Sequence, residues 1–561
     1  MQWFEEIDGN ATLDPTKDHV AASEKSVHNI AECKAKLIRR SQMRESFWLK
    51  MEVPLQETHD LAFDLFDRYG RLDREFYEHD FRKGTGVWGN ELNRGDLLLF
   101  ETLKVHADYR RCDIGTNLVK AILAKTRKKV SESVGFFAVA RPRFLYTELP
   151  REGAAQVKKE ICEISLGFWH SLGFRRVGTS SWFARTDSPD HPSRHLEIDQ
   201  DWKQPDEVGN SSSSDRFKQI FERLADPAVE ETKCIEELTN TLPEDSEDEQ
   251  WLSCNQDGNT ILHVAAMACK PELIKFVFSR AARLAAVRNK EGYTALEALR
   301  NQLEHQRTRK PRGTRTEVTS DAFKGFNMPN IACIAALENT TAFDLEILTP
   351  GDIEVAASVT DEEIQYAPQF DIAGIRNTLR YKYGCTCGQC VGGFLSSRMK
   401  FALLCVAELH HDLMHDAMHG SGPCWVECHD DLLTHLPGYV RENLKTNKSM
   451  REGFANMCDH FAECLRRGII PTERGVLDVL ARYQNEWPPV TKNFLQRGGT
   501  VAAVANMIFE KAMEGDEWAG DGEDREVFGE EIDELAVCRN DHEFGFVGGM
   551  CGYKRVRPAS S

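Results

Sequence analysis

Several features of common protein classes are missing from this chain. It has no uninterrupted apolar stretch near the roughly 20 residues of a membrane-spanning helix, and its start, MQWFEEIDGN, lacks the basic region and apolar core of a secretion signal. Lys and Arg number 70 against 89 Asp and Glu, so the net charge of −19 argues against nucleic acid or anionic membranes as partners. Walker-loop, Gly-x-Ser-x-Gly and His-Glu-x-x-His motifs are also absent. We expect a soluble intracellular protein, cytoplasmic and/or nuclear, with no membrane partner.

Length and composition indicate several domains. At about 100–200 residues per domain, the chain holds roughly three to four of them. Shifts in composition predict a loose N-terminus at 1–30, an αβ domain at 31–205, a linker and helical cap at 206–250, helical repeats at 251–305, a basic linker at 306–324, a helical domain with a Cys/His cluster at 325–513, and an acidic segment at 514–561. VGNSSSSD at 208–215 is typical of a flexible linker, and the eleven carboxylates against one arginine between residues 514 and 534 are typical of a solvated segment.

Residues 35–186 alternate between strand and helix patterns. DLLLFETLKV at 96–105 is a strongly apolar strand, and residues 109–129 have the apolar spacing of an amphipathic helix. The other expected elements are a strand at 35–40, a helix at 60–69, a strand at 136–140, a helix at 161–172 and closing strands at 174–177 and 181–185. The predicted fold class is α/β (α+β), a mixed sheet flanked by helices, followed by helical repeats and a mostly α C-terminal region.

The turn after the apolar strand carries residues suited to an anion. Arg110, Arg111 and Gly115 stand where the next helix begins. The first N–H groups of a helix have no internal partner, so they favour phosphate oxygens, and glycine permits close approach. The order of apolar strand, Val105, Arg110, Gly115, amphipathic helix, strand and a helix ending in FWHSLGF at 168–174 resembles the GNAT N-acetyltransferase superfamily over about 35–186.

This resemblance implies a GNAT-like acetyltransferase that uses acetyl-CoA. In the family a strand ends in Val before an Arg/Gln-x-x-Gly-x-Gly/Ala loop that holds the pyrophosphate, and a later helix ends in Tyr-x-x-x-Gly-Phe. Asp113 stands at the first glycine of the loop, and Trp169 stands where many relatives carry a tyrosine that is thought to protonate the leaving thiolate. A carboxylate about 4 Å from a phosphate costs on the order of 4 kcal/mol at an effective dielectric near 20, unless Asp113 points away or Arg110 and Arg111 offset it. The alternative is that Asp113 is a helix cap or first-turn residue. The implied cofactor-binding residues are Leu103, Val105, Arg110, Arg111, Cys112, Asp113, Ile114, Gly115 and Thr116.

Acetyl transfer needs a donor to the thioester carbonyl and a base for the ammonium. The resemblance implies a bulge near Leu103 to Val105 that aims a backbone N–H at the carbonyl. We expect Glu101 to be the catalytic base, because it lies two residues before Leu103 on the same nominal face and burial in LLLFETL would raise its pKa. The alternative is a salt-bridged or solvent-facing Glu101, with water as the base. His170 is expected at the surface rather than as an acid.

Two later segments repeat. DGNTILHVAA from Asp257 and KEGYTALEAL from Lys290 place glycine, threonine and leucine 34 residues apart, the period of a helical repeat. The first segment resembles the opening of an ankyrin repeat, with Ile261 in place of proline, and the combination resembles multidomain fungal-type GNAT/ankyrin proteins. Because roughly three repeats are needed for a stable stack, helices at 215–240 and after 325 should cap these two. The repeats would bind a protein partner or dock the acetyltransferase to the C-terminal region.

Clustered cysteines predict a metal site. Seventeen cysteines without a secretion signal should be mostly reduced thiols. Close spacing of soft ligands and a turn at Gly388 favour zinc, while packed thiols beside a polar stripe of histidines are the alternative. The candidate ligands are Cys385, Cys387 and Cys390 of GCTCGQC and Cys424 and Cys428 of CWVECH, with His410, His411, His415 and His419 between them.

Two functional hypotheses follow. The first is an N-acetyltransferase that passes an acetyl group from acetyl-CoA to an unknown amine, which can be a protein lysine, a protein N-terminus or a small amine. The second is a non-catalytic interaction protein with a degenerate GNAT fold, for which Asp113 and Trp169 are the signs. The basic residues at 307, 309, 310, 312 and 315 predict a nuclear import signal, an anion patch or a solvated loop.

Overall fold

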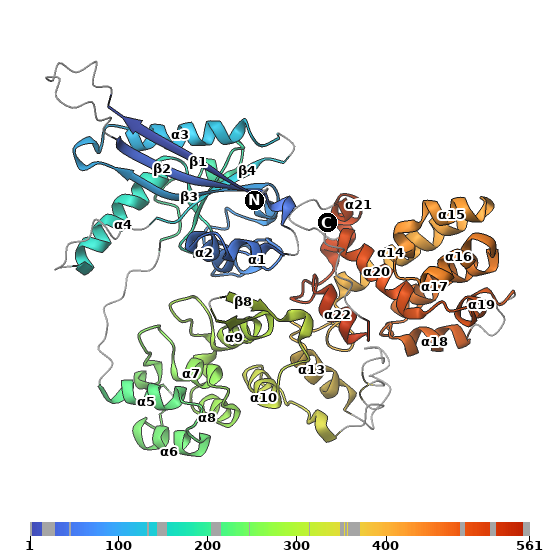
Figure 1. Ribbon diagram of the computed structural model, residues 1–561. Helices are drawn as coiled ribbons and strands as arrows, with labels where there is room; N and C mark the ends of the chain where they lie inside the picture. Colours follow the sequence, from blue (N-terminus) through green and yellow to red (C-terminus); the bar gives the residue numbers. More distant parts are fainter. Residues whose placement is uncertain are drawn as a thin grey trace. The chain divides into compact units, whose positions relative to one another are not determined.

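The chain forms two compact units (Figure 1). The computed structural model describes residues 3–13, 29–43, 46–131, 134–142, 154–203, 215–245, 247–313, 315–347, 353, 356, 371–482, 488–515 and 523–553. The first unit is Met1–Gly209 with Glu517–Gly522, and the second is Asn210–Asp516 with Glu523–Ser561. The division falls close to the boundary predicted at 205. The predicted linker at 208–214 and the acidic residues 516–522 lie outside the described residues.

A six-stranded mixed sheet organises the first unit, with strand order β1-β2-β3-β4-β6-β5. Among these strands β3 and β4 are the parallel neighbours, paired from Asp96 opposite Phe136 to Phe100 opposite Ala140, and the other pairs are antiparallel. The apolar runs of β3 and β4 suit the middle of the sheet, where both faces are covered. The strands are β1 (Phe4–Thr12), β2 (Asn29–Ile38), β3 (Asp96–Val105), β4 (Phe136–Ala140), β5 (Arg175–Arg176) and β6 (Phe183–Thr186).

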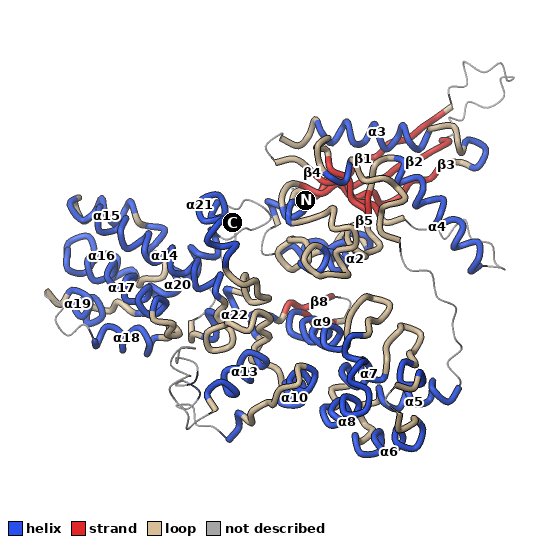
Figure 2. Tube along the Cα trace, turned by 180° about the vertical axis from the view of Figure 1, so that it is seen from behind, coloured by secondary structure: helices blue, strands red, loops and turns tan. Residues whose placement is uncertain are grey.

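Helices lie on both faces of this sheet (Figures 1 and 2). On one face lie α1 (Phe47–Glu52) and α2 (Gln56–Leu65), and on the other lies α3 (Ile114–Arg127). The apolar stripe of α3 packs on β1, β2 and β3, and α4 (Ala154–Ser171) ends in the same core through Trp169. The predicted mixed sheet flanked by helices is therefore present in the first unit.

The N-terminus corrects a prediction. Residues 1–30, expected to be loose, include β1, which pairs with β2 from Phe4 opposite Ile38 to Ala11 opposite Ala31. FEEIDGNAT gives a weak apolar signal because β1 is an edge strand in which Ile7 alone is buried. Its place in the sheet is fixed by backbone hydrogen bonds to β2, which composition does not reveal.

The second unit begins with three stacked helix pairs. The pairs are α5 (Asp215–Ala225) with α6 (Glu231–Thr241), α7 (Ile261–Met267) with α8 (Pro271–Ala281), and α9 (Ala295–Thr308) with α10 (Met328–Leu337). The first helices contact one another in the order α5, α7, α9, and the second helices in the order α6, α8, α10. The expectation that flanking helices cover the two repeats is confirmed by these contacts.

Equivalent turns explain the 34-residue period. Gly258 and Gly292 both have positive φ, and Thr260 and Thr294 both precede the first residue of a helix. His263 connects the first repeat to the second. Its Nδ1 lies 2.9 Å from the Thr260 hydroxyl of the first repeat, and its Nε2 lies 2.9 Å from the Tyr293 carbonyl oxygen of the second. His263 is fully buried, and burial lowers its pKa.

The basic linker at 306–324 is only partly a solvated loop. β7 (Arg309–Arg312) and β8 (Arg315–Val318) form a two-stranded hairpin, in which Lys310 pairs with Glu317 at 3.4 Å. Arg307 lies in α9, and its side chain is fully buried next to the rings of Phe323 and Phe546. The prediction of a solvated side chain is wrong for Arg307. Two aromatic rings and a hydrogen bond to the Asn540 side chain take the place of water around its guanidinium.

The remainder of the second unit is helical, and many of its helices pack around a separate apolar core. Its central helix is α17, which contacts α14, α16, α18, α19 and α20. The helices are α13 (Ile372–Lys382), α14 (Ser397–Asp416), α15 (Gly422–Cys428), α16 (Gly438–Thr446), α17 (Lys448–Arg466), α18 (Glu473–Arg482), α19 (Val490–Gln496), α20 (Val501–Gly515), α21 (Glu523–Glu534) and α22 (Phe544–Met550).

The C-terminal part also corrects a prediction. Residues 514–561 were expected to form an acidic C-terminal segment, solvated at 514–534, but residues 544–553 (FGFVGGMCGY) are apolar. Phe544, Phe546, Val547, Cys551 and Tyr553 are buried in the core around α17. The acidic composition of residues 514–534 therefore does not extend to the segment that follows.

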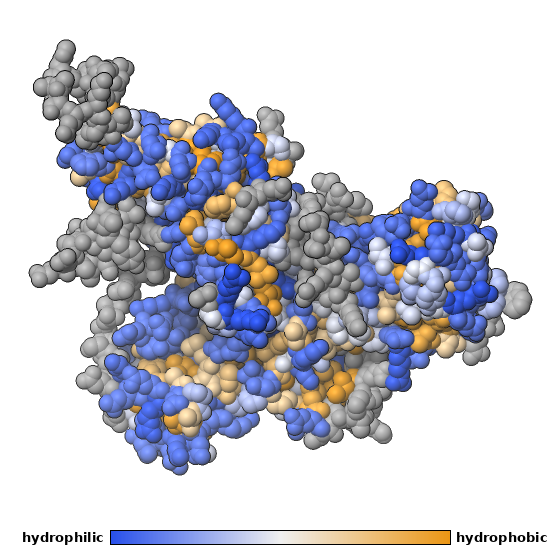
Figure 3. All heavy atoms as spheres, in the orientation of Figure 1, coloured by the Kyte–Doolittle hydropathy of each residue, from blue (hydrophilic) through white to orange (hydrophobic). Residues whose placement is uncertain are grey.

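Hydrophilic side chains cover most of the visible face of the molecule, with patches of hydrophobic residues between them (Figure 3). Among the described residues, no helix is both long and apolar enough to cross a lipid bilayer.

Candidate functional sites

The first candidate site lies where β3 leaves the sheet. β3 pairs with β4 as far as Phe100 and then continues for five residues to Val105. Over these residues β3 keeps its antiparallel partner β2, while no described strand pairs with it on the side of β4. Among the described residues no strand occupies that edge, so its backbone groups are candidates for binding an extended ligand that contains amides.

A β-bulge sits at Glu101, earlier than the predicted bulge near Leu103 to Val105. Lys34 pairs with Thr102 and Ala35 pairs with Phe100, so Glu101 is the extra residue of β3. The bulge reverses the alternation of side chains: Leu98, Phe100, Leu103 and Val105 all pack in the core under α3. Glu101 therefore does not share the face of Leu103, and that part of the prediction is wrong.

Glu101 faces the opposite side of the sheet and is ion-paired. Its Oε2 lies 3.5 Å from the ammonium of Lys36, a side chain that is 5% exposed and also contacts Glu6 at 2.6 Å. The neighbours of Lys36 along β2, Ala35 and Leu37, point into the core under α3, which places Lys36 and Glu101 on the face of α1 and α2. Glu101 thus lies beside a cation and not in the predicted apolar surroundings. This agrees with the alternative prediction of a salt-bridged Glu101.

The loop before α3 has a left-handed backbone at two non-glycine residues. Arg111 has φ +62° and Asp113 has φ +55°. Asp113 holds the N-cap position of α3 without a side-chain cap hydrogen bond, so the capping role weighed from the sequence is not made. A left-handed residue followed by helical ones turns successive N–H groups in one direction, which is the geometry of an anion-binding nest.

The other predicted cofactor residues surround this helix start. Arg110 and Arg111 are exposed, and the Arg110 Nε donates to the Val105 carbonyl oxygen at 3.1 Å. Gly115 is buried, and a Cβ there would meet Leu103 and Val105 at 3.5 Å, so α3 begins close to the end of β3. The remaining residues of this stretch are Cys112, which is exposed, and Ile114 and Thr116, which are half-buried.

The end of α4 holds no proton donor for a thiolate in the place that the resemblance implies. Trp169 is 7% exposed and packs against the rings of Phe100 and Phe174. His170, expected at the surface, is instead largely buried, and its Nε2 lies 2.9 Å from the Oδ2 of Asp201. Trp169 is a core residue, and His170 is held by a buried carboxylate.

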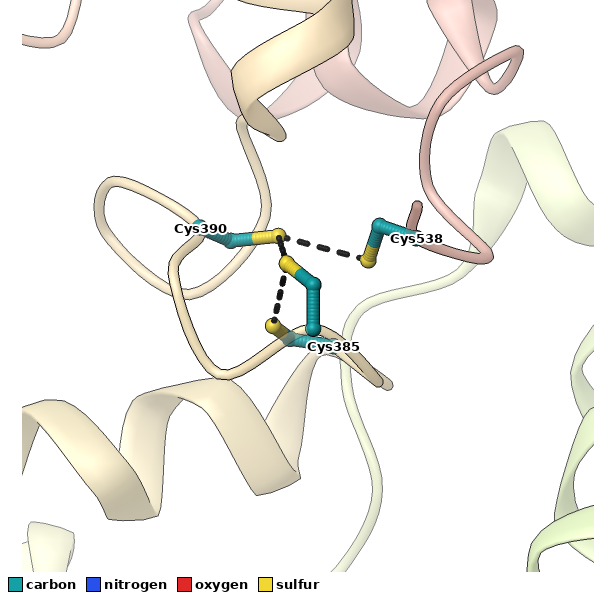
Figure 4. A group of neighbouring side chains, drawn as sticks. Cys385, Cys390 and Cys538 are labelled. Carbon is teal, nitrogen blue, oxygen red and sulfur yellow. Dashed lines mark hydrogen bonds between the residues drawn. The ribbon is translucent and has the colours of Figure 1, made fainter. Parts of the chain in front are cut away.

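The second candidate site is a cluster of four cysteines (Figure 4). Cys385, Cys387 and Cys390 come from the loop between α13 and α14, and Cys538 comes from the segment between α21 and α22. Their sulfur atoms lie within 4.8 Å of one another. Within the described part of the chain this is the one group of this kind, and it can hold a metal ion. Cys385, Cys390 and Cys538 are all buried.

The sulfur distances match a tetrahedral site. Sulfur atoms are 3.6 Å apart for Cys385 and Cys387, 3.8 Å for Cys387 and Cys390, and 3.5 Å for Cys390 and Cys538. Four ligands at a Zn–S distance of about 2.3 Å lie about 3.8 Å apart in a regular tetrahedron. A disulfide requires about 2.05 Å instead. The spacing therefore fits shared coordination of one ion and not a pair of disulfides.

Charge gives a second reason for a cation. Hydrogen bonds from Cys385, Cys387 and Cys390 lower the pKa of Cys538, and hydrogen bonds with Cys385, Cys387 and Cys538 raise the pKa of Cys390. Without a cation, a thiolate at a neighbouring cysteine therefore disfavours the thiolate form of Cys390. A divalent ion removes this conflict, because it binds all four cysteines as thiolates.

Local hydrogen bonds hold the ligand loop. Gly388 has φ +69°, which turns the chain between Cys387 and Cys390. The Gln389 N–H donates to the Cys387 sulfur at 3.4 Å, and the Thr386 hydroxyl donates to the Cys538 sulfur at 3.8 Å. Such outer contacts orient the ligands of a metal site.

Two predicted ligands lie elsewhere. Cys424 and Cys428 are exposed on α15, with their sulfur atoms 3.9 Å apart, and they do not join the cluster. Their sulfur atoms lie close together because residues four apart occupy the same face of a helix, one turn apart. The histidines between the two groups are not ligands either: His415 binds Asn456 at 2.8 Å, and His411 pairs with Asp412 at 2.9 Å.

Comparisons with protein-family models, with curated proteins and with solved structures gave no significant match.

Proposed function

We propose that the first unit is an acyltransferase that moves an acetyl group from acetyl-CoA to an amine, as the resemblance to the GNAT superfamily implies. The observation that carries the proposal is the open edge of β3 beyond Phe100, which leads directly through the 106–113 turn to the start of α3. An extended thioester cofactor needs both features at once. It requires a strand edge for the amides of its arm and N–H groups for its pyrophosphate.

The proposed cofactor position follows from these two features. The pyrophosphate lies at the N-terminus of α3, within reach of Arg110 and Arg111, and the arm runs along residues 101–105 toward the bulge at Glu101. Gly115 is buried at this helix start, beside Leu103 and Val105 of β3. Asp113 is exposed, so water screens its charge from a bound phosphate.

The transfer step needs little from the side chains. The neutral amine attacks the thioester carbon, a C–N bond forms, the C–S bond breaks, and the sulfur leaves as a thiolate that takes a proton. A backbone N–H beside the bulge would stabilise the oxyanion. Glu101, held by Lys36, is the proposed proton acceptor, with water as the alternative, and solvent protonates the thiolate because Trp169 is buried in the core.

Binding of acetyl-CoA to the full chain tests this proposal. By isothermal titration calorimetry we expect micromolar binding, weakened about tenfold or more in Arg110→Ala because a charge-assisted contact to phosphate is lost. Arg127→Ala is the matched control, since Arg127 lies at the other end of the same helix and pairs with Asp187. It should leave the affinity unchanged.

No binding by the folded chain at millimolar acetyl-CoA would overturn the acyltransferase. The interaction hypothesis would then stand, and the stacked helix pairs α5 to α10 would be the surface to test for a protein partner.

We further propose that the four-cysteine cluster holds a structural zinc ion. Four thiolates with no open position are typical of structural zinc, whereas catalytic sites keep one position for water. Metal analysis of the purified chain should give about one zinc, and less than a tenth of that in Cys390→Ser. Cys424→Ser, with its thiol outside the cluster, should keep the full content. Equal zinc content in Cys390→Ser and in the unaltered chain would reject the assignment.

A further inference from the structure

The segment around Cys538 lies between the two apolar cores of the second unit. Upstream of α22, residues 538–543 read CRNDHE, and Asn540, Asp541 and Glu543 are all buried. A polar segment of this kind gains little from the hydrophobic effect, which depends on buried apolar area. Its buried position therefore depends on specific polar contacts and on Cys538.

These contacts tie the segment to two other parts of the unit. The Arg539 N–H donates to the Thr386 hydroxyl at 3.2 Å, and the Arg539 guanidinium donates to the Arg300 carbonyl oxygen of α9 at 2.7 Å. The Asn540 side chain donates to the Tyr383 carbonyl oxygen at 3.3 Å. The segment thus contacts both the ligand loop and α9, which belongs to the third helix pair.

Arg307 extends the same junction from α9. Its fully buried guanidinium donates to the Asn540 Oδ1 at 2.8 Å and stacks near Phe323 and Phe546. Phe546 belongs to α22 and to the core around α17. The helix pairs, the ligand loop and the C-terminal segment consequently meet at this one place.

We infer that the metal ion at Cys385, Cys387, Cys390 and Cys538 is a clasp that fastens residues 538–543 to the ligand loop and to α9. The inference rests on the zinc proposed above and assigns what that ion does. Three ligands lie within six residues of one loop, and the fourth lies 148 residues after Cys390. A closed tetrahedral site forms only when Cys538 arrives, so metal binding and docking of the segment are the same event.

Because of the clasp, the docking of this segment in the second unit depends on the bound metal ion. Hydrogen bonds such as those of Arg539 and Asn540 exchange with bonds to water, so they hold the segment weakly on their own. Loss of the ion removes the metal–sulfur bonds that join Cys538 to the ligand loop. The segment then opens locally, while α7, α8 and α17 keep their own cores.

Amide hydrogen exchange of the full chain, read by mass spectrometry together with zinc content, tests the clasp. We compare the unaltered chain, the chain treated with a chelator, and the variants Cys387→Ser, Cys538→Ser and Cys424→Ser. Cys387→Ser is the decisive variant, because its altered side chain lies in the loop while the readout lies in residues 538–543. We expect zinc to be lost and exchange in 538–543 to rise at least tenfold in both cluster variants and with chelator. Exchange in α7 and α17 reports that the rest of the unit stays folded.

The outcomes separate the clasp from the zinc. Zinc lost from Cys387→Ser with unchanged exchange in 538–543 would overturn the clasp and keep the metal site. Full zinc content in Cys538→Ser would overturn the clasp as well, because the fourth ligand would then be dispensable. No zinc in the unaltered chain, with exchange insensitive to chelator, would overturn both. Cys424→Ser should match the unaltered chain in both readouts.

Discussion

Replacing Arg40 with alanine is expected to destabilise the first unit by about 3–5 kcal/mol. Arg40 follows β2 and is 1% exposed. Its guanidinium donates to the carbonyl oxygens of Gly95 at 2.7 Å, Gly70 at 3.0 Å and Leu92 at 2.5 Å, and also to that of Arg94. Alanine removes the donor from these acceptors, and each unpaired buried group costs about 1–3 kcal/mol.

The same hydrogen bonds explain why no other side chain replaces Arg40 fully. They join two loops, one around Gly70 after α2 and one at 92–95 before β3, to the end of β2. Arg40→Lys keeps a charge but presents a single ammonium to acceptors that a planar guanidinium reaches together. We therefore expect Arg40→Lys to recover only part of the lost stability.

Urea unfolding followed by tryptophan fluorescence measures this effect, since Trp48, Trp88 and Trp182 are buried in the first unit. Arg127→Ala is the control. Arg127 is 62% exposed and pairs with Asp187 at the surface, where an ion pair contributes about 0–1 kcal/mol. Similar losses for Arg40→Ala and Arg127→Ala would contradict the buried hydrogen-bond network.

The central elements of the first unit could be predicted because their signals are local. DLLLFETLKV is apolar enough for a strand covered on both faces, and the stripe of Leu118, Ile122 and Leu123 specifies the face of α3. β1 was missed because an edge strand with one buried residue is fixed by its partner and not by its own composition. The position of Glu101 was wrong because a bulge depends on the register between two strands, and alternation counted along one strand cannot include it.

The four-cysteine cluster shows the same limit. Cys385, Cys387 and Cys390 were predicted because one loop holds them, whereas Cys538 lies 148 residues after Cys390 and is joined by the fold. Cys424 and Cys428 were selected instead for their nearness in sequence. The sequence held one indication of a fixed turn at Cys538, which is Asp541 three residues later. In the structure the Asp541 carboxylate accepts a hydrogen bond from the Cys538 N–H at 2.9 Å. Only the structure joins this turn to the loop.

Replacing His263 is expected to cost far more than replacing its counterpart 34 residues later, Glu297. Each residue is the third of its helix, and each side chain contacts the threonine at the N-cap position of that helix. Glu297 binds within its own repeat, through the Thr294 N–H at 2.8 Å, while His263 also reaches the Tyr293 carbonyl oxygen in the next repeat. We expect about 3 kcal/mol for His263→Ala and about 1 kcal/mol for Glu297→Ala.

The pH dependence of stability tests the same bonds. Burial lowers the pKa of His263, so the unfolded chain binds its proton more readily than the folded chain does. This group's contribution is therefore fully present above its unfolded pKa of about 6.5 and is lost as pH falls below that value, by at most about 1.4 kcal/mol per pH unit. Protonation also removes the Nδ1 lone pair that meets the Thr260 hydroxyl.

Urea unfolding of the second unit at pH 7.5 and pH 5 measures the effect as a difference between the unaltered chain and His263→Gln. Glutamine is uncharged at both pH values and keeps one donor and one acceptor, so the variant should lose less stability on acidification than the unaltered chain. Subtracting the two pH profiles cancels the titration of all other groups. An equal loss in both proteins would mean that His263 takes its proton as readily in the folded chain as in the unfolded chain, and the buried bridge between the two repeats would then be refuted.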